Sequence, residues 1–595
     1  MVNLGPSRGC RTCKERRVKC DEGKPACQRC LRLGRECGGY QKKVAPLKFK
    51  EQKINYGPIP LQRRASPGSS STSSSTPSKQ RQSRQQNRQL NLTVTHSRSG
   101  CRTPMSSSPS PIPSDDDTAV SFFLRHFCVS NPRNLYIGGF CDTLPSVLAS
   151  ERRDSPLYAA IVAVSSWVLT FWTNGGLPNK KPHEWHVRAI EWLRTAIRDP
   201  QESQRQSTIL AAFVLQLYDN FSAFRGLREA PRLHYDGAVA LLKRQPVEVL
   251  SSPCWNRMVS HVLHVEVVSA IQEKQHFPLS EFSWVQLDLM PLNSNTGLDV
   301  IGITIANLQS RYLALMEHDD IYPIAEQDLD NLLLDMEDAE AQLLDWQNTV
   351  PDHWHPSYLQ QVKLAEPPIM SYGGDCDIYP SLQVAATWNT WRNYRILLFK
   401  MTIGILDRVP PTAFSYFDIN KRAKMEAYAR SSIQDMVDSL CRSIPFHLGN
   451  RIFSGSLDDL NDPNIEVPSY YDLEFCSDNQ FEATSEENLA ISEAYRRHVI
   501  ALGPWHISVP LCNLVSIISE PFGSFIARSL RPGQLDFVRG ELIRVAMILQ
   551  IEAPELENAK KWARGMPVEH FHTDPLDLDA VVAKMRNCLS VSSGL

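Results

Sequence analysis

Apolar side chains recur at helical spacing through most of the chain beyond residue 118. Two stripes have apolar residues every three or four positions, as on the buried face of an amphipathic helix. The first consists of Ile301, Ile305, Leu308, Tyr312 and Leu315, and the second of Val384, Trp388, Trp391, Tyr394, Leu398, Met401 and Ile405. Strand-like alternation is scarce. These patterns predict a mostly α protein, with one large all-α domain over residues 119–595.

Two segments are apolar on nearly every side rather than along one face. Residues 207–218, STILAAFVLQLY, open on Ser and Thr, which are favoured N-cap residues, and predict a central helix of a large bundle. Residues 157–172 form a nearly apolar run interrupted by Ser165 and Ser166. This run is shorter than the roughly 20 residues that span a bilayer, so we predict a buried helix. An acidic stretch at about 454–487 interrupts the helices and predicts a long surface loop.

The first fifth of the chain lacks the apolar residues that a conventional core needs. All 12 tryptophans lie at or beyond Trp167, and the aromatic residues of positions 1–118 are Tyr40, Phe49 and Tyr56. From residue 41 to 118 the composition is rich in Ser, Pro, Gln and Arg, which cannot bury enough surface to offset chain entropy. We therefore predict a disordered, basic linker over residues 41–118.

Formal charge divides along the chain in the same way. Residues 1–118 carry 23 Lys+Arg and 8 Asp+Glu, or +15, whereas residues 119–595 carry the other 40 and 57, or -17, and the two sums give the net charge of -2. A basic N-terminal part is suited to a polyanion such as nucleic acid. The opening residues lack the apolar core of a secretory signal. We expect a reducing compartment, where cysteines are thiols or metal ligands.

Six cysteines near the N-terminus form two identical C-x2-C-x6-C units. They are Cys10, Cys13, Cys20, Cys27, Cys30 and Cys37. Two tetrahedral zinc ions need eight thiolate bonds, so two of the six thiolates must bridge. Sharing the first cysteine of each unit satisfies both ions: Cys10 and Cys27 bridge, Cys13 and Cys20 complete one site, and Cys30 and Cys37 complete the other. Both ions are then fully coordinated, which is typical of structural zinc.

The segment from Gly9 to Tyr40 resembles the Zn2Cys6 binuclear cluster, the DNA-binding domain of fungal transcription factors. The resemblance rests on every cysteine interval, on the basic KERRVK after Cys13, and on Asp21 and Pro25. It implies a DNA-binding domain at residues 1–40 that recognises a CGG-type triplet in double-stranded DNA. The DNA-binding residues that it implies are Lys14, Arg16, Arg17 and Lys19.

Among these four residues, Arg17 falls at the family position that contacts a base. A guanidinium can donate two hydrogen bonds to guanine O6 and N7, whereas a lysine ammonium is suited to a phosphate contact. Five outer cations would add contacts to the DNA backbone or long-range attraction: Arg11, Lys24, Arg29, Arg32 and Arg35.

Two shorter motifs resemble the helical regulatory region found behind such clusters in many fungal regulators. They are LQLYDN at 215–220 and HYDGAVALLKR at 234–244. The resemblance implies a nuclear RNA polymerase II transcription factor that works with the transcription machinery. Activation is favoured over repression by the resemblance and by the acidic residues near 455–487.

The oligomeric state stays open at this level, and no membrane partner is expected. Pro46, Pro58 and Pro60 interrupt the only mildly apolar stretch behind the cysteines, so no dimerising coiled coil is predicted. Monomeric DNA binding and a homodimer through the helical domain are the two arrangements left.

The sequence gives little support for an enzyme, and we predict no catalytic residue. His183 and His186 are three positions apart and depart from the H-E-x-x-H spacing. His570, His572 and Asp574 would align only on a strand or an extended loop. His234 beside Asp236 is interpreted as a packing detail rather than a ligand site.

Two further features are interpreted as structural. The tryptophans Trp167, Trp172, Trp388 and Trp391 are expected to belong to the core, with an inducer pocket as the less favoured interpretation. The nine cysteines outside the cluster, such as Cys128, Cys254 and Cys512, are expected to be buried or inert. The alternative to a gene regulator is a zinc-stabilised interaction protein or a small-molecule-binding protein.

Overall fold

The computed structural model of the chain divides into two compact units, Met1–Met105 and Ser106–Leu595. The described residues are 12–13, 18, 20–21, 27–34, 37, 115–128, 139–173, 180–226, 228, 230–245, 253–285, 293–316, 326–360, 368–408, 419–452, 456–470, 486–520, 524–552 and 581–585. Of the linker predicted at 41–118, all but its last four positions lies outside this set. The His570, His572 and Asp574 group lies outside it as well.

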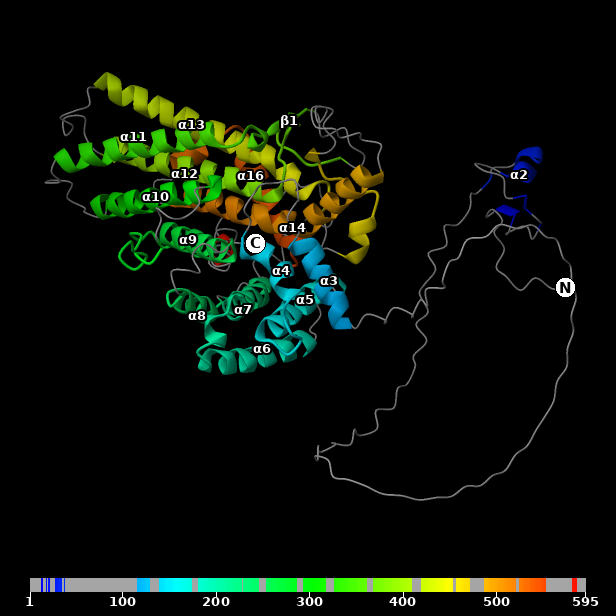
Figure 1. Ribbon diagram of the computed structural model, residues 1–595. Coiled ribbons are helices and arrows are strands. Elements are labelled where there is room, and N and C mark those ends of the chain that lie inside the picture. The colour runs from blue at the N-terminus through cyan, green and yellow to red at the C-terminus, as the bar shows by residue number, and fades with distance from the viewer. Residues whose placement is uncertain are drawn as a thin grey trace, which may run out of the picture. The chain divides into compact units, whose positions relative to one another are not determined.

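The second unit is almost entirely helical, which confirms the predicted fold class (Figure 1). Its first described helix, α3, begins at Asp115, so the expected boundary at 119 falls inside that helix. The helices are α3 (Asp115–Phe127), α4 (Leu144–Leu148), α5 (Pro156–Thr173), α6 (Lys180–Arg198), α7 (Gln206–Arg225), α8 (Leu233–Leu242), α9 (Pro253–Glu273), α10 (Ser294–Met316), α11 (Glu326–Thr349), α12 (Leu382–Arg408), α13 (Ile419–Leu448), α14 (Glu486–Ser519), α15 (Ser524–Ser529) and α16 (Gln534–Ile548).

Strands are scarce in the described part of the chain, as predicted. A single antiparallel pair joins β1 (Ser357–Leu359) to β2 (Cys376–Ile378), with Tyr358 opposite Asp377. Strand β2 is buried and packs against α13. This pair therefore covers one part of the helical unit rather than forming a sheet of its own.

Two groups of helices make up the core of this unit. Helices α5, α6 and α7 pack on one another, with α3 against α5 and α8 against α7. Helices α10, α11, α12 and α13 form the second group and lie side by side in Figure 1. Helix α14 contacts α3 as well as α12 and α13, and so connects the two groups.

Helix α7 is buried on every side over the predicted segment, since each residue from Ser207 to Tyr218 is buried. The prediction that Ser and Thr cap this helix is wrong. The helix begins at Gln206, and its N-cap residue, Arg205, makes no capping hydrogen bond with its side chain. Thr208 lies within the first turn, where its hydroxyl donates to the Glu202 carbonyl at 2.7 Å.

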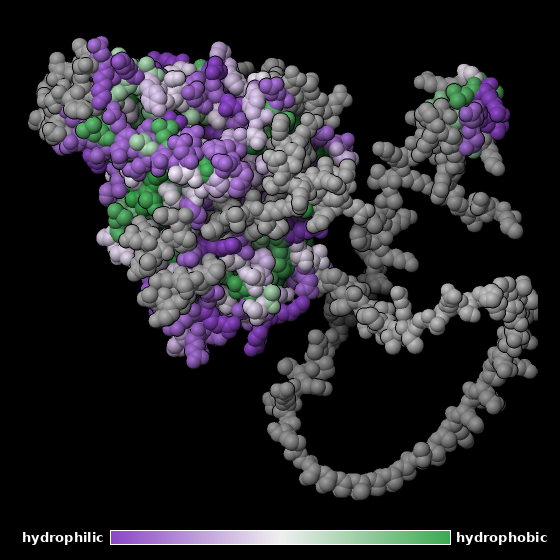
Figure 2. All heavy atoms as spheres, turned by 45° about the horizontal axis from the view of Figure 1, so that its top comes forward, coloured by the Kyte–Doolittle hydropathy of each residue, from purple (hydrophilic) through white to green (hydrophobic). Residues whose placement is uncertain are grey.

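The apolar run at 157–172 forms the buried helix α5, as predicted. Two helices are long and apolar enough to cross a membrane: α5 and the Ala490–Ser519 part of α14. In these helices 67% and 78% of the most apolar window is buried inside the fold. The face of the molecule in Figure 2 is mostly hydrophilic, with scattered apolar patches. Burial among neighbouring helices thus accounts for the apolar composition of both segments.

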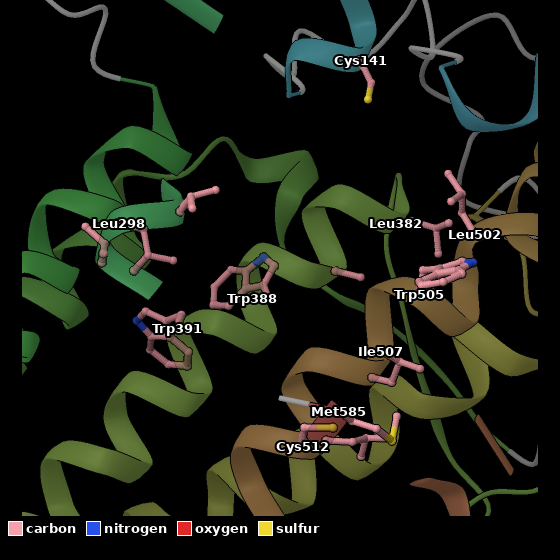
Figure 3. Close-up of a cluster of buried hydrophobic side chains, with 14 of the residues drawn as sticks. Cys141, Leu298, Leu382, Trp388, Trp391, Leu502, Trp505, Ile507, Cys512 and Met585 are labelled. Atoms are coloured by element: carbon pink, nitrogen blue, oxygen red, sulfur yellow. The ribbon is translucent and has the colours of Figure 1, made fainter. Parts of the chain in front are cut away.

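The tryptophans of α12 lie in the core, as predicted. Trp388 and Trp391 are buried, and their indole N–H groups donate to the carbonyls of Trp354 and Leu343, both at 2.8 Å. Figure 3 shows the two indoles among other buried hydrophobic side chains. They also border an open hollow of about 520 Å³ that Arg392 helps to line. Their hydrogen bonds fix both rings and satisfy the buried donors.

The acidic stretch at 454–487 is not a surface loop throughout: residues 457–461 form a 3-10 helix, whereas residues 462–466 form neither helix nor strand and are exposed or partly exposed, as predicted. Ser456 caps the 3-10 helix Leu457–Asn461, and Leu460 is buried against the helical unit. The capping side chains are Ser and Asp, which the composition had indicated as loop residues. The rest of the stretch lies outside the described residues.

Candidate metal centre and nucleic-acid interface

Five of the six predicted zinc ligands lie among the described residues, and they gather in one small cluster. Cys13, Cys27 and Cys30 are buried, and Cys20 and Cys37 are partly buried against them. Val18 packs on the same group. The sixth predicted ligand, Cys10, lies outside the described residues.

The distance between Cys13 Sγ and Cys27 Sγ, 3.7 Å, fits two ligands of one metal ion. Cys13 Sγ also lies 3.9 Å from Cys30 Sγ, although the predicted arrangement assigns these two thiolates to different ions. Two thiolates on one tetrahedral zinc lie about 3.8 Å apart, because each Zn–S bond is about 2.3 Å long. Within the described part of the chain no pair of cysteines forms a disulfide. The cluster is therefore suited to zinc rather than to disulfide bonds.

Cys27 occupies the centre of the cluster. Its side chain is fully buried, and its sulfur lies within 4.8 Å of the sulfurs of Cys13 and Cys30 and, in a second group, of Cys20. The backbone N–H of Cys27 also donates to Cys37 Sγ at 3.4 Å. A thiolate shared by two ions must approach the ligands of both, so this central place is compatible with the bridging role predicted for Cys27.

The second cysteine unit opens a short helix, α2 (Gln28–Arg32). Cys27 is its N-cap residue, and Cys27 Sγ accepts a hydrogen bond from the Cys30 backbone N–H at 3.3 Å. The helix ends at Arg32, and two positions later Gly34 has a φ of +58°, which is left-handed and favours glycine. The C-x2-C spacing thus puts two sulfurs on one helical turn.

Asp21 holds the start of α2 from outside the helix. Its carboxylate oxygens accept hydrogen bonds from the backbone N–H groups of Gln28 at 2.9 Å and Arg29 at 3.1 Å. A carboxylate at a helix N-terminus satisfies donors that have no partner within the helix and opposes the helix dipole. Asp21 lies near Cys20 and Cys27, but these two bonds make it a capping group.

The sequence indicated Asp21 only as part of a motif and did not predict this role. The signal was the Asp itself, a favoured capping residue, placed before a helix. This signal is hard to recognise in the sequence, because Asp21 lies seven and eight positions before Gln28 and Arg29, the residues whose N–H groups donate to its carboxylate.

The predicted DNA-binding residues Lys14, Arg16, Arg17 and Lys19 lie outside the described residues. Their flanking cysteines, Cys13 and Cys20, are both part of the cluster. Among the described cations of this unit, Arg29 and Arg32 lie on α2 and are exposed. Exposure of this kind is what a phosphate contact requires.

The cysteines outside the cluster are buried wherever the structure describes them, as expected. They are Cys128, Cys141, Cys254, Cys376, Cys441 and Cys512. Burial raises the pKa of the Cys441 thiol to about 12, so this thiol stays protonated at neutral pH. A protonated, buried thiol is neither a nucleophile nor a metal ligand.

Comparison with known proteins identifies the cluster. The fungal Zn(2)-Cys(6) binuclear cluster domain matches residues 8–46. This match includes all six predicted ligands and the basic segment between Cys13 and Cys20. No solved structure matches the chain significantly.

Short segments are similar to fungal regulators. They include the aspercryptin biosynthesis cluster-specific transcription regulator atnN of Emericella nidulans (48% identical over 62 residues, 10% of this chain and 9% of that protein). The transcriptional regulatory protein moc3 of Schizosaccharomyces pombe is 51% identical over 39 residues, 7% of this chain and 8% of moc3. Sterol uptake control protein 2 of Saccharomyces cerevisiae is 66% identical over 29 residues, 5% of this chain and 3% of that protein.

The matches thus cover less than a tenth of the length of these relatives. They concern a module rather than whole proteins, and the geometry of the thiols agrees with them. Residues 8–46 of this chain therefore belong to the fungal Zn(2)-Cys(6) binuclear cluster family, whose domain binds two zinc ions.

Proposed function

We propose that the chain is a nuclear, sequence-specific DNA-binding transcription factor that activates RNA polymerase II genes. The observation that carries this proposal is the match of residues 8–46 to a fungal Zn(2)-Cys(6) domain, together with the clustered thiols inside it. The similar proteins with established names are transcription regulators, which supports a role in gene control rather than in catalysis. The helical unit would then have a regulatory role.

We assign the ligands and domains as the sequence predicted them. Cys10 and Cys27 bridge the two ions, Cys13 and Cys20 complete one site, and Cys30 and Cys37 complete the other. The central position of Cys27 supports this arrangement. The proposed domains are the DNA-binding domain at 1–40, the linker at 41–118 and the regulatory domain at 119–595.

The zinc ions supply the stability that this small unit cannot obtain from an apolar core. The basic segment between Cys13 and Cys20 is short, and both flanking thiols belong to the cluster, so zinc binding would hold its two ends. Arg17 can then donate two hydrogen bonds to guanine O6 and N7 of a CGG-type triplet. Lys14, Arg16 and Lys19 would bind the neighbouring phosphates and set the orientation.

A binding-site selection with the purified full-length protein tests this function. We expect the recovered duplexes to share a CGG-type triplet, and binding to weaken steeply with salt and to disappear with a zinc chelator. The spacing of the triplets also distinguishes a monomer from a homodimer. A protein that holds two zinc ions but shows no preference among duplexes would instead be a zinc-stabilised interaction protein.

A further inference from the structure

Three side chains from consecutive helices converge in the helical unit. His186 comes from α6, Asp219 from α7 and His234 from α8. His186 Nε2 lies 3.2 Å from Asp219 Oδ1, and His234 Nε2 lies 3.6 Å from Asp219 Oδ2. One ligand atom from each residue lies within 4.8 Å of the other two. The imidazoles of His186 and His234 therefore both face the Asp219 carboxylate, each from a helix that packs against α7.

The contact between His186 and Asp219 is not a hydrogen bond. His186 Nε2 is inaccessible to solvent and has no hydrogen-bond partner, although the carboxylate oxygen lies 3.2 Å away. Buried polar atoms without a partner are rare in native proteins and call for an explanation. The close approach of this nitrogen to a carboxylate oxygen without a hydrogen bond is compatible with two ligands of one metal ion.

Packing holds the group in place. The His186 ring stacks on Tyr218, with ring centroids 4.3 Å apart and an interplanar angle of 19°. Helix α7 packs against both α6 and α8. Such a site is preorganised, because its ligands lie on packed helices rather than on loops.

We propose that His186, Asp219 and His234 form a binding site for a divalent transition-metal ion of the zinc class. Imidazole nitrogen and carboxylate oxygen bind zinc at about 2.0–2.2 Å, which places ligand atoms about 3.3–3.6 Å apart in a tetrahedron. The two imidazole–carboxylate distances, 3.2 Å to Asp219 Oδ1 and 3.6 Å to Asp219 Oδ2, are close to that spacing, with each histidine facing its own carboxylate oxygen. Two imidazoles favour zinc, cobalt or nickel over magnesium and calcium, which prefer oxygen ligands.

The surroundings leave room for an ion to enter and for water to complete its coordination. The side chains of His186, Asp219 and His234 are 13%, 22% and 20% exposed. The Arg194 guanidinium lies close enough to His234 to act on it electrostatically. Because this cation repels a metal ion, we expect weaker binding here than at the thiolate cluster.

The site would join three helices of the unit, so metal binding should stabilise it. The two histidines belong to sequence signals that appeared unrelated, and Asp219 lies in the LQLYDN motif. Only the packing of α6, α7 and α8 brings them together. This inference does not depend on DNA binding, since its residues lie outside the cluster.

A metal titration of the full-length protein tests the site. The protein is first loaded with two equivalents of zinc and then titrated with Co²⁺, while the visible spectrum and metal content are followed. We expect a third equivalent to bind with weak visible bands and without the strong near-ultraviolet absorption of cobalt–thiolate bonds. A further equivalent of Zn²⁺ should displace the cobalt and raise the melting temperature of the helical unit.

Matched variants assign the effect to these residues. His234→Gln and Asp219→Asn should lose the third ion and the rise in melting temperature, whereas the exposed His276→Gln should keep both. Far-ultraviolet circular dichroism of each metal-free variant checks that the helices are intact. If the wild type binds no third ion, or if folded His234→Gln still binds it, the proposal is overturned. Either outcome leaves the DNA-binding test of the cluster unaffected.

Discussion

The zinc cluster and the helical unit reach a stable structure by different means. In the described part of the cluster, the buried core consists of Cys13, Cys27 and Cys30, with Val18 partly buried beside them. The helical unit has one continuous hydrophobic core that includes residues from nearly every helix. Metal bonds thus replace apolar burial where the chain is too short to form a core.

Charged side chains also have different uses in the two units. The helical unit buries some of them in pairs, such as Arg544 with Glu541 at 2.8 Å, both fully buried. On the cluster, Arg29 and Arg32 are exposed on α2. Buried charges of the first kind contribute to specifying one packing arrangement, whereas exposed cations of the second kind are available to a polyanion. The difference agrees with the proposal that the cluster is the unit that recognises DNA.

Removal of the Cys27 thiol should give the largest difference in effect between the two units. We expect Cys27→Ser to abolish zinc loading and DNA binding, because a structural zinc contributes on the order of 10 kcal/mol to such domains. The thermal unfolding of the helical unit should not change. Zinc content, a gel-shift assay and calorimetry measure the three effects. Cys254→Ala, a buried cysteine of the helical unit, is the control that should keep both ions.

A cavity in the helical core should destabilise the helical unit and leave the zinc cluster unchanged. Phe221 is buried and stacks on Trp167, with ring centroids 5.4 Å apart. The ring centroids of Phe221 and Trp505 are 4.9 Å apart. We expect Phe221→Ala to lower the free energy of unfolding of this unit by about 3–5 kcal/mol. Urea unfolding followed by tryptophan fluorescence measures the loss.

In the same Phe221→Ala protein, zinc content and DNA affinity should stay at the wild-type level. Leu279→Ala, at a side chain that is 49% exposed, is the matched control and should change stability by at most about 0.5 kcal/mol. Loss of zinc from Phe221→Ala would show that the two units do not fold independently.

The role of Arg17 can be tested without disturbing either core. We expect Arg17→Ala to weaken binding to the selected site by about 1–3 kcal/mol and to relax the preference at one base pair. Lys19→Ala should weaken binding to all sequences alike and reduce the salt slope by about 1. Gel shifts over a series of duplexes and salt concentrations measure both. Uniform weakening by Arg17→Ala would contradict its base-reading role.

Acid should destabilise the helical unit through a buried imidazole. Burial lowers the pKa of His261 to about 3, from an ordinary value of 6.5. As the pH falls below about 6.5, the unfolded chain takes up this proton while the folded chain does not. The contribution of His261 to stability is therefore complete above pH 6.5 and decreases by about 1.4 kcal/mol per pH unit toward pH 3.

The matched variant for this effect is His261→Gln, which is neutral throughout the range. Its unfolding free energy, measured by urea between pH 7 and pH 4, should decrease less steeply with falling pH than that of the wild type. The difference in slope should correspond to the uptake of one proton, about 1.4 kcal/mol per pH unit. Parallel pH profiles in the two proteins would mean that His261 is not the responsible group.

Much of the fold was accessible from periodicity, and the exceptions are local. The stripes at 301–315 and 384–405 form α10 and α12, because a helix exposes the same face every 3.6 residues. The cap of α7 and the 3-10 helix at Leu457–Asn461 were predicted wrongly because Ser, Thr and Asp are common in caps, turns and loops alike. Which of these they form depends on the acceptors or donors that the neighbouring chain supplies.

Burial of charged side chains in α12 could not be predicted from the sequence. Arg392 and Arg395 lie next to residues of the apolar stripe, and both are buried. Arg392 donates to Tyr379 at 2.7 Å, and Arg395 donates to Glu340 at 3.2 Å. Composition favours exposed positions for arginine. Only partners from distant parts of the chain make their burial possible.

The sequence by itself determined the zinc chemistry and the helical class of this protein. Cysteine intervals and apolar periods act over a few residues, so the chain carries them before it folds. Tertiary structure alone decided that Asp21 caps α2, and that His186 and His234 meet at Asp219. These contacts join segments that are separated along the chain. The number of residues between two segments does not fix their distance in space, so packing determines which side chains meet.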